Sequence, residues 1–312
     1  MSKNTASQAL NKTIKLIEGA YAPSTIRAYK SNFEKFIQFC ESENKLALPA
    51  NPATVAKFIQ ILTKSGLKSS SIRLAFASIS TIHKLNELPD PTQSPIAKLE
   101  LRRMHRTLGR FSKQALGITA LLLKRMLTSC KEDMRGIRDR AILLLAYETL
   151  CRRSELVSLR IEDIEYRPEL NHIRIRLCKS KTDQESLGKW IEITEQAHTA
   201  IRNWLQIAGI YDGFIMRGIT PNGIVTPSLQ AAQINRIYKK LAKLSGLEKH
   251  LISRISGHSL RVGSAQDLAS AGTSLPQLML KGRWTKPETA LRYSEKYSPD
   301  SLTTPTLLIQ KI

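Results

Sequence analysis

The sequence predicts a mainly α-helical protein of two domains, the second of which contains a small antiparallel β-sheet. First, 312 residues are enough for two domains of ordinary size. Second, apolar side chains recur at helical spacing through residues 1–110, and they return to that spacing after residue 195. Third, residues 172–178 (HIRIRLC) alternate apolar and basic side chains, which is typical of a half-buried strand.

The N-terminal domain is predicted to span residues 1–108 and to be all-helical. Between Thr25 and Cys40, apolar side chains recur every three or four positions, so one face of that helix is expected to be buried. Residues 89–95 contain three prolines and interrupt the helical pattern before the last helix. The helices expected in this domain cover about 25–40, 52–64, 69–88 and 96–109.

A linker at residues 109–117 is predicted to precede the second domain, residues 118–312. Thr119 is a suitable cap for the first helix of that domain. The strand at 172–178 and a second strand, KWIEI at 189–193, are expected to pair as a hairpin. The remaining helices are expected at about 136–150, 195–208, 228–245, 258–271, 274–281 and 286–294.

The charge of the chain indicates an acidic partner. The sequence has 48 Lys and Arg against 26 Asp and Glu, a net charge of +22. Such a charge repels itself in the compact state, so nucleic acid, ribosomal RNA or a membrane surface would be suitable partners. Residues 1–110 carry 17 basic and 7 acidic residues, and residues 111–312 carry 31 and 19. Because the excess is not confined to a tail, both domains are expected to touch the polyanion, as in a clamp.

Several classes of function are disfavoured by what the sequence lacks. No apolar run approaches the ~20 residues of a membrane span, and the N-terminus has no apolar signal-peptide core, so no membrane partner and a cytoplasmic location are expected. The four cysteines show no CxxC spacing and are expected to be reduced, mostly buried thiols. There is no P-loop, no HExxH and no carboxylate cluster of the kind that holds Mg²⁺. We therefore expect no metal, cofactor or small-molecule substrate.

Five short segments carry groups that together suit phosphodiester transfer without a metal, although each is weak evidence alone. Two arginines can neutralise the charge that develops on the nonbridging phosphate oxygens. A histidine can hold the same oxygens or relay a proton, and a lysine at a hairpin tip can protonate the leaving oxygen. A tyrosine can form a phosphodiester that conserves the energy of the broken bond. The groups are Arg152 in TLCRRSEL, Lys181 in CKSKTDQ, His258 and Arg261 in SGHSLRVG, Trp284 in GRW and Tyr293 in ALRYSEKY.

The order Arg, Lys, His-x-x-Arg, Trp, Tyr resembles that of the tyrosine recombinase (phage integrase) family, and the resemblance spans nearly the whole chain. In the family's first motif an arginine lies three residues before a glutamate, which selects Arg152 over Arg153 and gives Glu155 as its partner carboxylate. The resemblance implies an N-terminal SAM-like core-binding domain followed by the recombinase catalytic domain.

The remaining family positions are assigned in the same way. A tyrosine nine residues after the tryptophan selects Tyr293 over Tyr297. Lys181 matches the hairpin lysine, with Lys179 as an adjacent competitor. Many family members have a histidine where this chain has Trp284.

The resemblance implies a specific reaction. Tyr293 would attack the scissile phosphate and form a 3′-phosphotyrosyl link, with Lys181 as the general acid. Two sequential strand exchanges would pass through a Holliday junction. Arg152, Arg261, His258 and Trp284 would hold the phosphate, and Glu155 would orient the cationic groups.

The resemblance also implies the partners of the protein. The chain is expected to be monomeric when free and to form a homotetramer on double-stranded DNA with paired inverted half-sites. The tail at 303–312 would pack into a neighbouring subunit or fold back on its own domain. The gene would belong to a bacterium, a phage or a plasmid, and the protein to the nucleoid. The side chains expected to face the DNA grooves are Thr25, Arg27, Ser70, Arg73, Gln233, Asn235, Arg236 and Lys239.

Other classes of protein remain alternatives at this point. A type IB topoisomerase shares the catalytic logic but relaxes supercoils without a paired site. A protelomerase closes hairpin ends, usually with a longer chain. A DNA-binding relative without activity would lack one of the catalytic groups, and none is missing. A ribosomal or RNA-binding protein would explain the charge but not the ordered groups.

Overall fold

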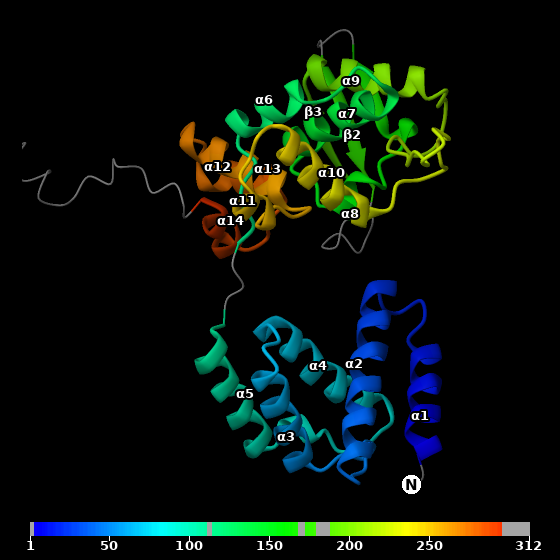
Figure 1. Ribbon diagram of the computed structural model, residues 1–312, viewed down its shortest axis with the longest axis vertical. Coiled ribbons are helices and arrows are strands. Elements are labelled where there is room, and N and C mark those ends of the chain that lie inside the picture. The colour runs from blue at the N-terminus through cyan, green and yellow to red at the C-terminus, as the bar shows by residue number, and fades with distance from the viewer. Residues whose placement is uncertain (1–2, 111–113, 168–171, 179–187, 295–312) are drawn as a thin grey trace, which may run out of the picture. The chain divides into compact units, whose positions relative to one another are not determined.

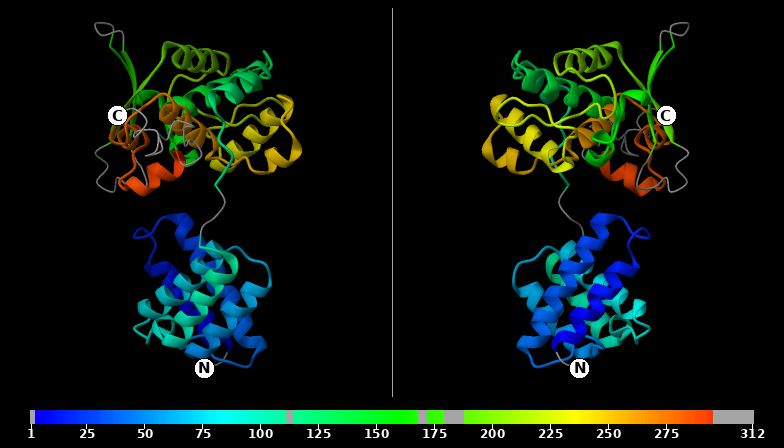
Figure 2. Two further views of the ribbon diagram at one scale, coloured as in Figure 1. Left: turned by 90° about the vertical axis from the view of Figure 1, so that its left-hand side faces the viewer. Right: turned by 90° about the vertical axis from the view of Figure 1, so that its right-hand side faces the viewer.

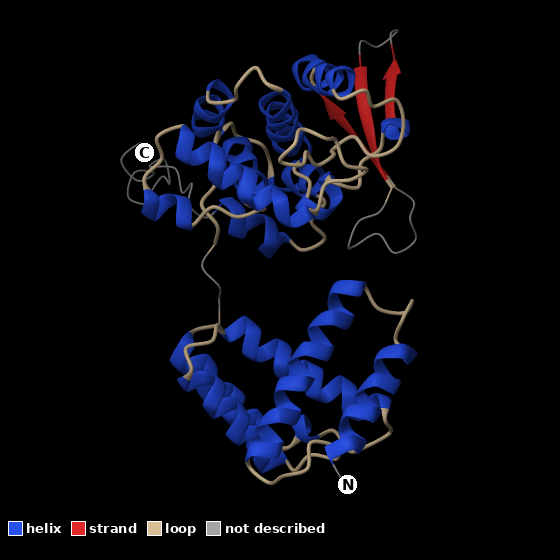
Figure 3. Ribbon diagram, turned by 45° about the vertical axis from the view of Figure 1, so that its right-hand side comes forward, coloured by secondary structure: helices blue, strands red, loops and turns tan. Residues whose placement is uncertain are grey.

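The fold was analysed in a computed structural model that describes residues 3–110, 114–167, 172–178 and 188–294 (Figure 1). The chain forms two compact units that divide between Gln114 and Ala115. The first unit is helical, and the second is helical apart from three strands (Figure 3). The predicted fold class is therefore confirmed.

The N-terminal unit consists of helices whose apolar faces pack together. The periodic face of the second helix is buried as expected, with Phe33, Phe36 and Cys40 fully shielded from solvent. The next helix, Pro52–Lys64, begins after Asn51. The side chain of Asn51 accepts a hydrogen bond from the backbone N–H of Ala53 at 2.8 Å and so caps a free donor at the helix end. The helices are α1 (Lys3–Leu16), α2 (Pro23–Ser42), α3 (Pro52–Lys64), α4 (Ser69–Leu85) and α5 (Pro95–Leu108).

Two features of this unit differ from the sequence prediction. Helix α1 was not predicted, although its buried side chains, Leu10 and Ile14 among them, join the core of the unit. Helix α4 was predicted to continue to residue 88 but ends at Leu85. It ends there because Glu87 adopts the left-handed conformation (φ 55°), which cannot continue a right-handed helix.

The C-terminal unit places a three-stranded antiparallel sheet beside a bundle of helices. The strands follow the order β1 (Ile164–Arg167), β2 (His172–Leu177), β3 (Lys189–Ile193), so β2 is central. The predicted hairpin pairing of β2 and β3 is confirmed, and Ile175 of β2 lies opposite Ile191 of β3. The alternation in β2 is also confirmed, because its isoleucines and leucine face the core. Strand β1 was not predicted.

The central turns of α7 (Met134–Thr149) are buried in the core of this unit. The sheet and the α10 region lie on opposite sides of the unit in the two views of Figure 2. Helices α8 and α11 are too short to give a periodic pattern and were not predicted. The helices are α6 (Ala120–Thr128), α7 (Met134–Thr149), α8 (Arg153–Leu156), α9 (Glu195–Ile207), α10 (Ala231–Leu244), α11 (Lys249–Ser253), α12 (Ser259–Ser270), α13 (Leu275–Gly282) and α14 (Pro287–Ser294).

The start of α6 corrects the predicted cap. Thr119 occupies the capping position, but its side chain accepts no capping hydrogen bond. Instead, Asp267 of α12 accepts from the N–H of Ala120 at 2.7 Å and from the hydroxyl of Tyr147 at 2.6 Å. A carboxylate from a distant helix therefore satisfies the helix end, and it ties α6 and α7 to α12.

The cysteines agree with the expectation of mostly buried thiols. Cys40, Cys130 and Cys151 are buried and Cys178 is exposed, and none of the four forms a disulfide. Among the described residues, no helix is both long and apolar enough to cross a bilayer.

Candidate active site

The site begins at the end of α7, where the chain turns sharply. Leu150 adopts the left-handed conformation (φ 49°) and ends the helix, so that Arg152 lies just before α8. The backbone N–H of Arg152 donates to Glu155 at 2.9 Å, and its guanidinium Nη1 donates to the same carboxylate at 2.6 Å. The Glu155 side chain is only 3% exposed, whereas that of Arg152 is 20% exposed. Glu155 therefore anchors a guanidinium that solvent, and hence an anion, can still reach.

The electrostatics keep Glu155 ionised. Burial alone would raise the pKa of this carboxyl, but the hydrogen bonds and charge of Arg152 and the charge of Arg283 lower it below its ordinary value. The carboxylate is therefore negative at neutral pH.

The second arginine, Arg261, is fixed by backbone carbonyls. It lies in the first turn of α12, is 2% exposed, and donates through Nη1 to Leu150 and through Nη2 to the carbonyl of Gly282. Burial, with the nearby charges of Arg152 and Arg283, lowers the pKa of Arg261 to about 10. Arg261 therefore remains a cation at neutral pH in a position set by two distant segments.

His258 precedes α12 and is neutral at neutral pH. Its pKa is lowered by burial first and then by the positive charges of Arg261 and Arg152. A neutral imidazole beside two cations can accept or pass on a proton when a phosphate enters the site.

Trp284 and Tyr293 complete the site. The guanidinium of Arg261 lies over the Trp284 ring, 4.7 Å from its centroid. Tyr293 lies on α14, and its ring stacks on the Trp284 ring at a centroid distance of 5.0 Å and an interplanar angle of 24°. Gly282 is required here, because a Cβ at this position would overlap the Trp284 ring. The tyrosine is thus connected to an arginine through one tryptophan.

The structure brings together most of the catalytic residues expected from the sequence. They are Arg152, Glu155, His258, Arg261, Trp284 and Tyr293. Lys181, its competitor Lys179, Tyr297 and the tail at 303–312 lie outside the described residues. In the described part of the chain, no group of three or more His, Cys, Asp or Glu side chains is placed to hold a metal ion.

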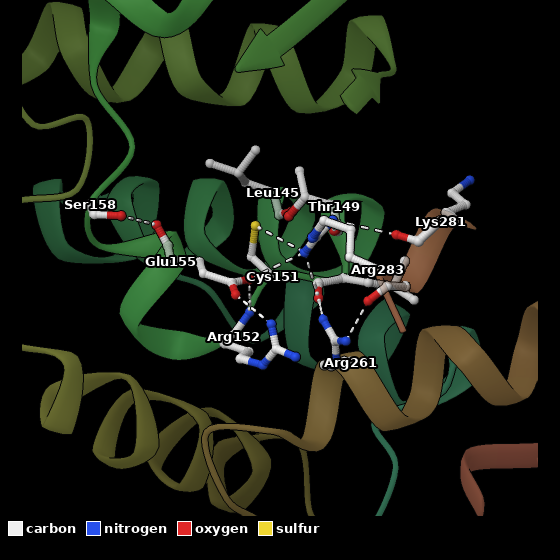
Figure 4. A network of polar contacts seen from close by, with 11 residues as sticks. Leu145, Thr149, Cys151, Arg152, Glu155, Ser158, Arg261, Lys281 and Arg283 are labelled. Atoms are coloured by element: carbon white, nitrogen blue, oxygen red, sulfur yellow. Dashed lines mark hydrogen bonds and ion pairs between the residues drawn. The ribbon is translucent and has the colours of Figure 1, made fainter. Parts of the chain in front are cut away.

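Arg283 is a component of the site that sequence reasoning missed. Its side chain is 4% exposed and donates a hydrogen bond to Glu155 at 3.2 Å (Figure 4). The sequence analysis considered the motif GRW only for its tryptophan. The available signal was an arginine three positions after the apolar segment LPQLML, but local periodicity does not reveal such a contact.

The side chains expected to face DNA are all at least partly exposed. Within the N-terminal unit, Thr25 and Arg27 lie near the start of α2, and Ser70 and Arg73 near the start of α4. Within the C-terminal unit, one helix, α10, carries the rest. They are Gln233, Asn235, Arg236 and Lys239. Their role in reading DNA stays a prediction.

The sequence of the chain matches the profiles of a known family. The chain belongs to the phage integrase family, whose profile matches residues 118–298, more than half of the chain. The profile of the phage integrase N-terminal SAM-like domain matches residues 14–86. The resemblance noted in the sequence is therefore confirmed.

Individual relatives are distant but align over most of their length. Recombinase Cre of Escherichia phage P1 is 26% identical over 292 residues, which cover 88% of this chain and 84% of Cre. An XerD homologue of Selenomonas ruminantium, an integrase/recombinase, is 27% identical over 299 residues, 91% of this chain and 85% of that protein. The resemblance to Cre is therefore that of a distant relative.

Solved structures share the fold. The integrase of transposon Tn1549, in complex with circular intermediate DNA, superposes with a TM-score of 0.67 at 14% identity, covering 98% of this chain and 99% of that one. XerH recombinase bound to a palindromic difH substrate gives a TM-score of 0.67 at 18% identity, covering 93% and 81%.

Proposed function

We propose that this protein is a site-specific DNA recombinase that cleaves and rejoins DNA through a 3′-phosphotyrosyl intermediate on Tyr293. The observation that carries the proposal is the stack of Tyr293 on Trp284, which in turn lies against the guanidinium of Arg261. Membership of the phage integrase family supports the same reaction.

The residues of the site suit the steps of cleavage. The oxygen of Tyr293 attacks the phosphorus, and the bond from phosphorus to the 5′-oxygen breaks. Arg152 and Arg261 donate hydrogen bonds to the nonbridging oxygens, where negative charge develops. Neutral His258 holds one of these oxygens or relays a proton. Lys181, on the connection between β2 and β3, protonates the leaving 5′-oxygen.

Rejoining reverses the same chemistry on a different strand. A 5′-hydroxyl from a partner duplex attacks the phosphotyrosyl phosphorus, and the bond to the oxygen of Tyr293 breaks. Two such exchanges pass through a Holliday junction. We propose a homotetramer on paired inverted half-sites for this step, with a monomeric protein in the absence of DNA. Both proposals follow from family membership.

We also propose that the two domains have different functions. Residues 1–108 form the core-binding domain, residues 109–117 the linker and residues 118–312 the catalytic domain. The net charge of +22 supports DNA as the partner of both. Action on DNA in the cytoplasm, within the nucleoid of a bacterial cell, fits this partner.

The nucleophile can be tested directly. DNA sites are first selected by binding the protein to a random pool of duplexes. A nick is then placed near the scissile position, so that cleavage releases a short fragment with the 5′-hydroxyl and religation is prevented. The parental protein should accumulate a covalent adduct at the 3′ end, visible on a denaturing gel. Tyr293→Phe should bind this DNA with parental affinity and form no adduct, and Tyr297→Phe is the matched control. An adduct in the Tyr293→Phe variant would disprove the assignment.

Loss of a phosphate-binding arginine should act on rate more than on binding. Arg152→Ala is expected to slow adduct formation by about 10²–10³-fold at saturating DNA, the usual effect of removing one oxyanion stabiliser. A loss below tenfold would show that Arg152 does not hold the transferring phosphate.

A further inference from the structure

Arg283 occupies a position that is unfavourable for an arginine. It follows α13 in the left-handed backbone conformation, with φ 55° and ψ 47°. Residues other than glycine adopt this conformation infrequently. Its guanidinium is also removed from water, since the side chain is 4% exposed, and a buried charge is costly unless it is paired. Such a residue needs compensating contacts.

One set of contacts is to the end of α7. Nη1 of Arg283 donates to the carbonyl of Thr149 at 2.9 Å, and Nη2 donates to that of Leu150 at 3.2 Å. The Leu150 carbonyl also accepts a hydrogen bond from Nη1 of Arg261. The two arginines are therefore held by one shared acceptor.

A second contact is to the Glu155 carboxylate. Nη2 of Arg283 donates to Oε2 of Glu155 at 3.2 Å, while Nη1 of Arg152 donates to Oε1 at 2.6 Å. Figure 4 shows Glu155 together with both guanidinium groups. Without Arg283, the carboxylate would keep Arg152 as its only hydrogen-bonding side chain among the described residues and would lose one of the three hydrogen bonds that fix its orientation.

We infer that Arg283 is a positioning residue for strand cleavage, an inference that rests on the proposed recombinase function. It fixes the Leu150 carbonyl and the Glu155 carboxylate, and through these two acceptors it fixes the guanidinium groups of Arg261 and Arg152. Arg283 is too buried to touch DNA itself. It also directly precedes Trp284, so the same turn sets the ring on which the nucleophile stacks.

The charge of Arg283 gives a readout that a purely structural role would not alter. Glu155 is surrounded by Arg152 and Arg283, which lower its pKa against the effect of burial, and it interacts electrostatically with Cys151, His258 and Arg261. Removing the Arg283 charge raises the pKa of Glu155. The acid limb of the cleavage rate against pH should then move to higher pH.

The test compares Arg283→Gly and Arg283→Lys with the parental chain on nicked duplex DNA that the parental chain cleaves. Glycine adopts the left-handed conformation readily, so the Gly variant removes the guanidinium without adding backbone strain. Single-turnover cleavage at saturating DNA should fall by about 10²-fold, the effect of displacing a catalytic group by about 1 Å. The dissociation constant for DNA should stay within about threefold of the parental value.

The Lys variant separates charge from geometry. An ammonium group restores the positive charge but cannot reproduce the planar fork that reaches several acceptors. The acid limb should therefore return toward the parental pH, while the rate at saturation stays about tenfold or more below it. Lys281→Ala is the control for lost charge, because Lys281 is exposed and lies in the same turn.

The outcomes are distinguishable. If Arg283→Gly cleaves saturating DNA at the parental rate with an unshifted acid limb, the positioning role is refuted, even if the variant melts at a lower temperature. A parental chain that forms no adduct on Tyr293 would instead overturn the proposed function, and the inference with it.

Discussion

Replacing Trp284 by alanine should separate the cleavage rate from DNA binding. The Trp284 side chain is 6% exposed and has Arg261 against its ring and Tyr293 stacked at 5.0 Å. It also belongs to the small apolar cluster around Leu150 and Ala290 that connects α7, α12 and α14. Truncation removes the surface that sets the distance between Tyr293, the proposed nucleophile, and Arg261, a proposed phosphate-binding arginine.

The magnitude follows from these contacts. A desolvated cation–π contact and a stacked aromatic pair are together worth about 2–3 kcal/mol. If all of this interaction energy stabilises the transition state, its loss slows cleavage by about 30- to 160-fold. The lost burial should also lower the free energy of unfolding by about 3–5 kcal/mol. Trp284→Phe keeps a ring against both neighbours, so its cleavage rate should fall by less than about tenfold.

The assay is single-turnover formation of the covalent adduct at saturating DNA, at a temperature well below the unfolding midpoint of each variant. Circular dichroism gives that midpoint, and a gel-shift titration gives the affinity. Parental cleavage by Trp284→Ala would refute the reasoning. Equal losses in the Ala and Phe variants would also refute it, because the argument depends on the ring.

Three further predictions concern stability and DNA binding. His83 is buried, its Nε2 accepts from the N–H of Ala50 at 3.0 Å, and burial lowers its pKa. The unfolded state therefore binds the extra proton, and the free energy of unfolding should fall as pH drops below about 6.5, by at most about 1.4 kcal/mol per pH unit for this group. Urea titrations at pH 7.5 and 5.5 should show a smaller fall for His83→Gln, and an equal fall would contradict the assignment. Gly263→Ala should destabilise the chain by about 1–3 kcal/mol, measured by the same titration, since the added methyl overlaps the carbonyl of Ile118; a neutral effect would mean that α12 can move away. If Arg236 contacts a phosphate, Arg236→Ala should reduce the slope of log affinity against log salt by about 1 in filter-binding or gel-shift assays, and an unchanged slope would exclude that contact.

The sequence by itself determined the class of fold and supplied most of the residues of the proposed catalytic set. Amphipathic periodicity predicted α2 and α4 because helix burial repeats every three to four residues, and the alternation in β2 predicted its buried face. Phosphodiester transfer requires side chains of these chemical types, and their order along the chain resembles that of the phage integrase family, so the catalytic residues could be proposed. Short elements such as α8 and β1 escaped prediction, since four residues do not show a period.

Tertiary structure alone decided which groups orient the catalytic residues. Arg283 contacts the carbonyl of Thr149 across 134 positions of sequence, and Asp267 caps α6 across 147. Local patterns report burial and turn preference, but they carry no information on which distant acceptor a buried donor will meet. Arg283 contacts Glu155 and shares the Leu150 carbonyl with Arg261, and these contacts exist only because α7, α12 and α13 pack together.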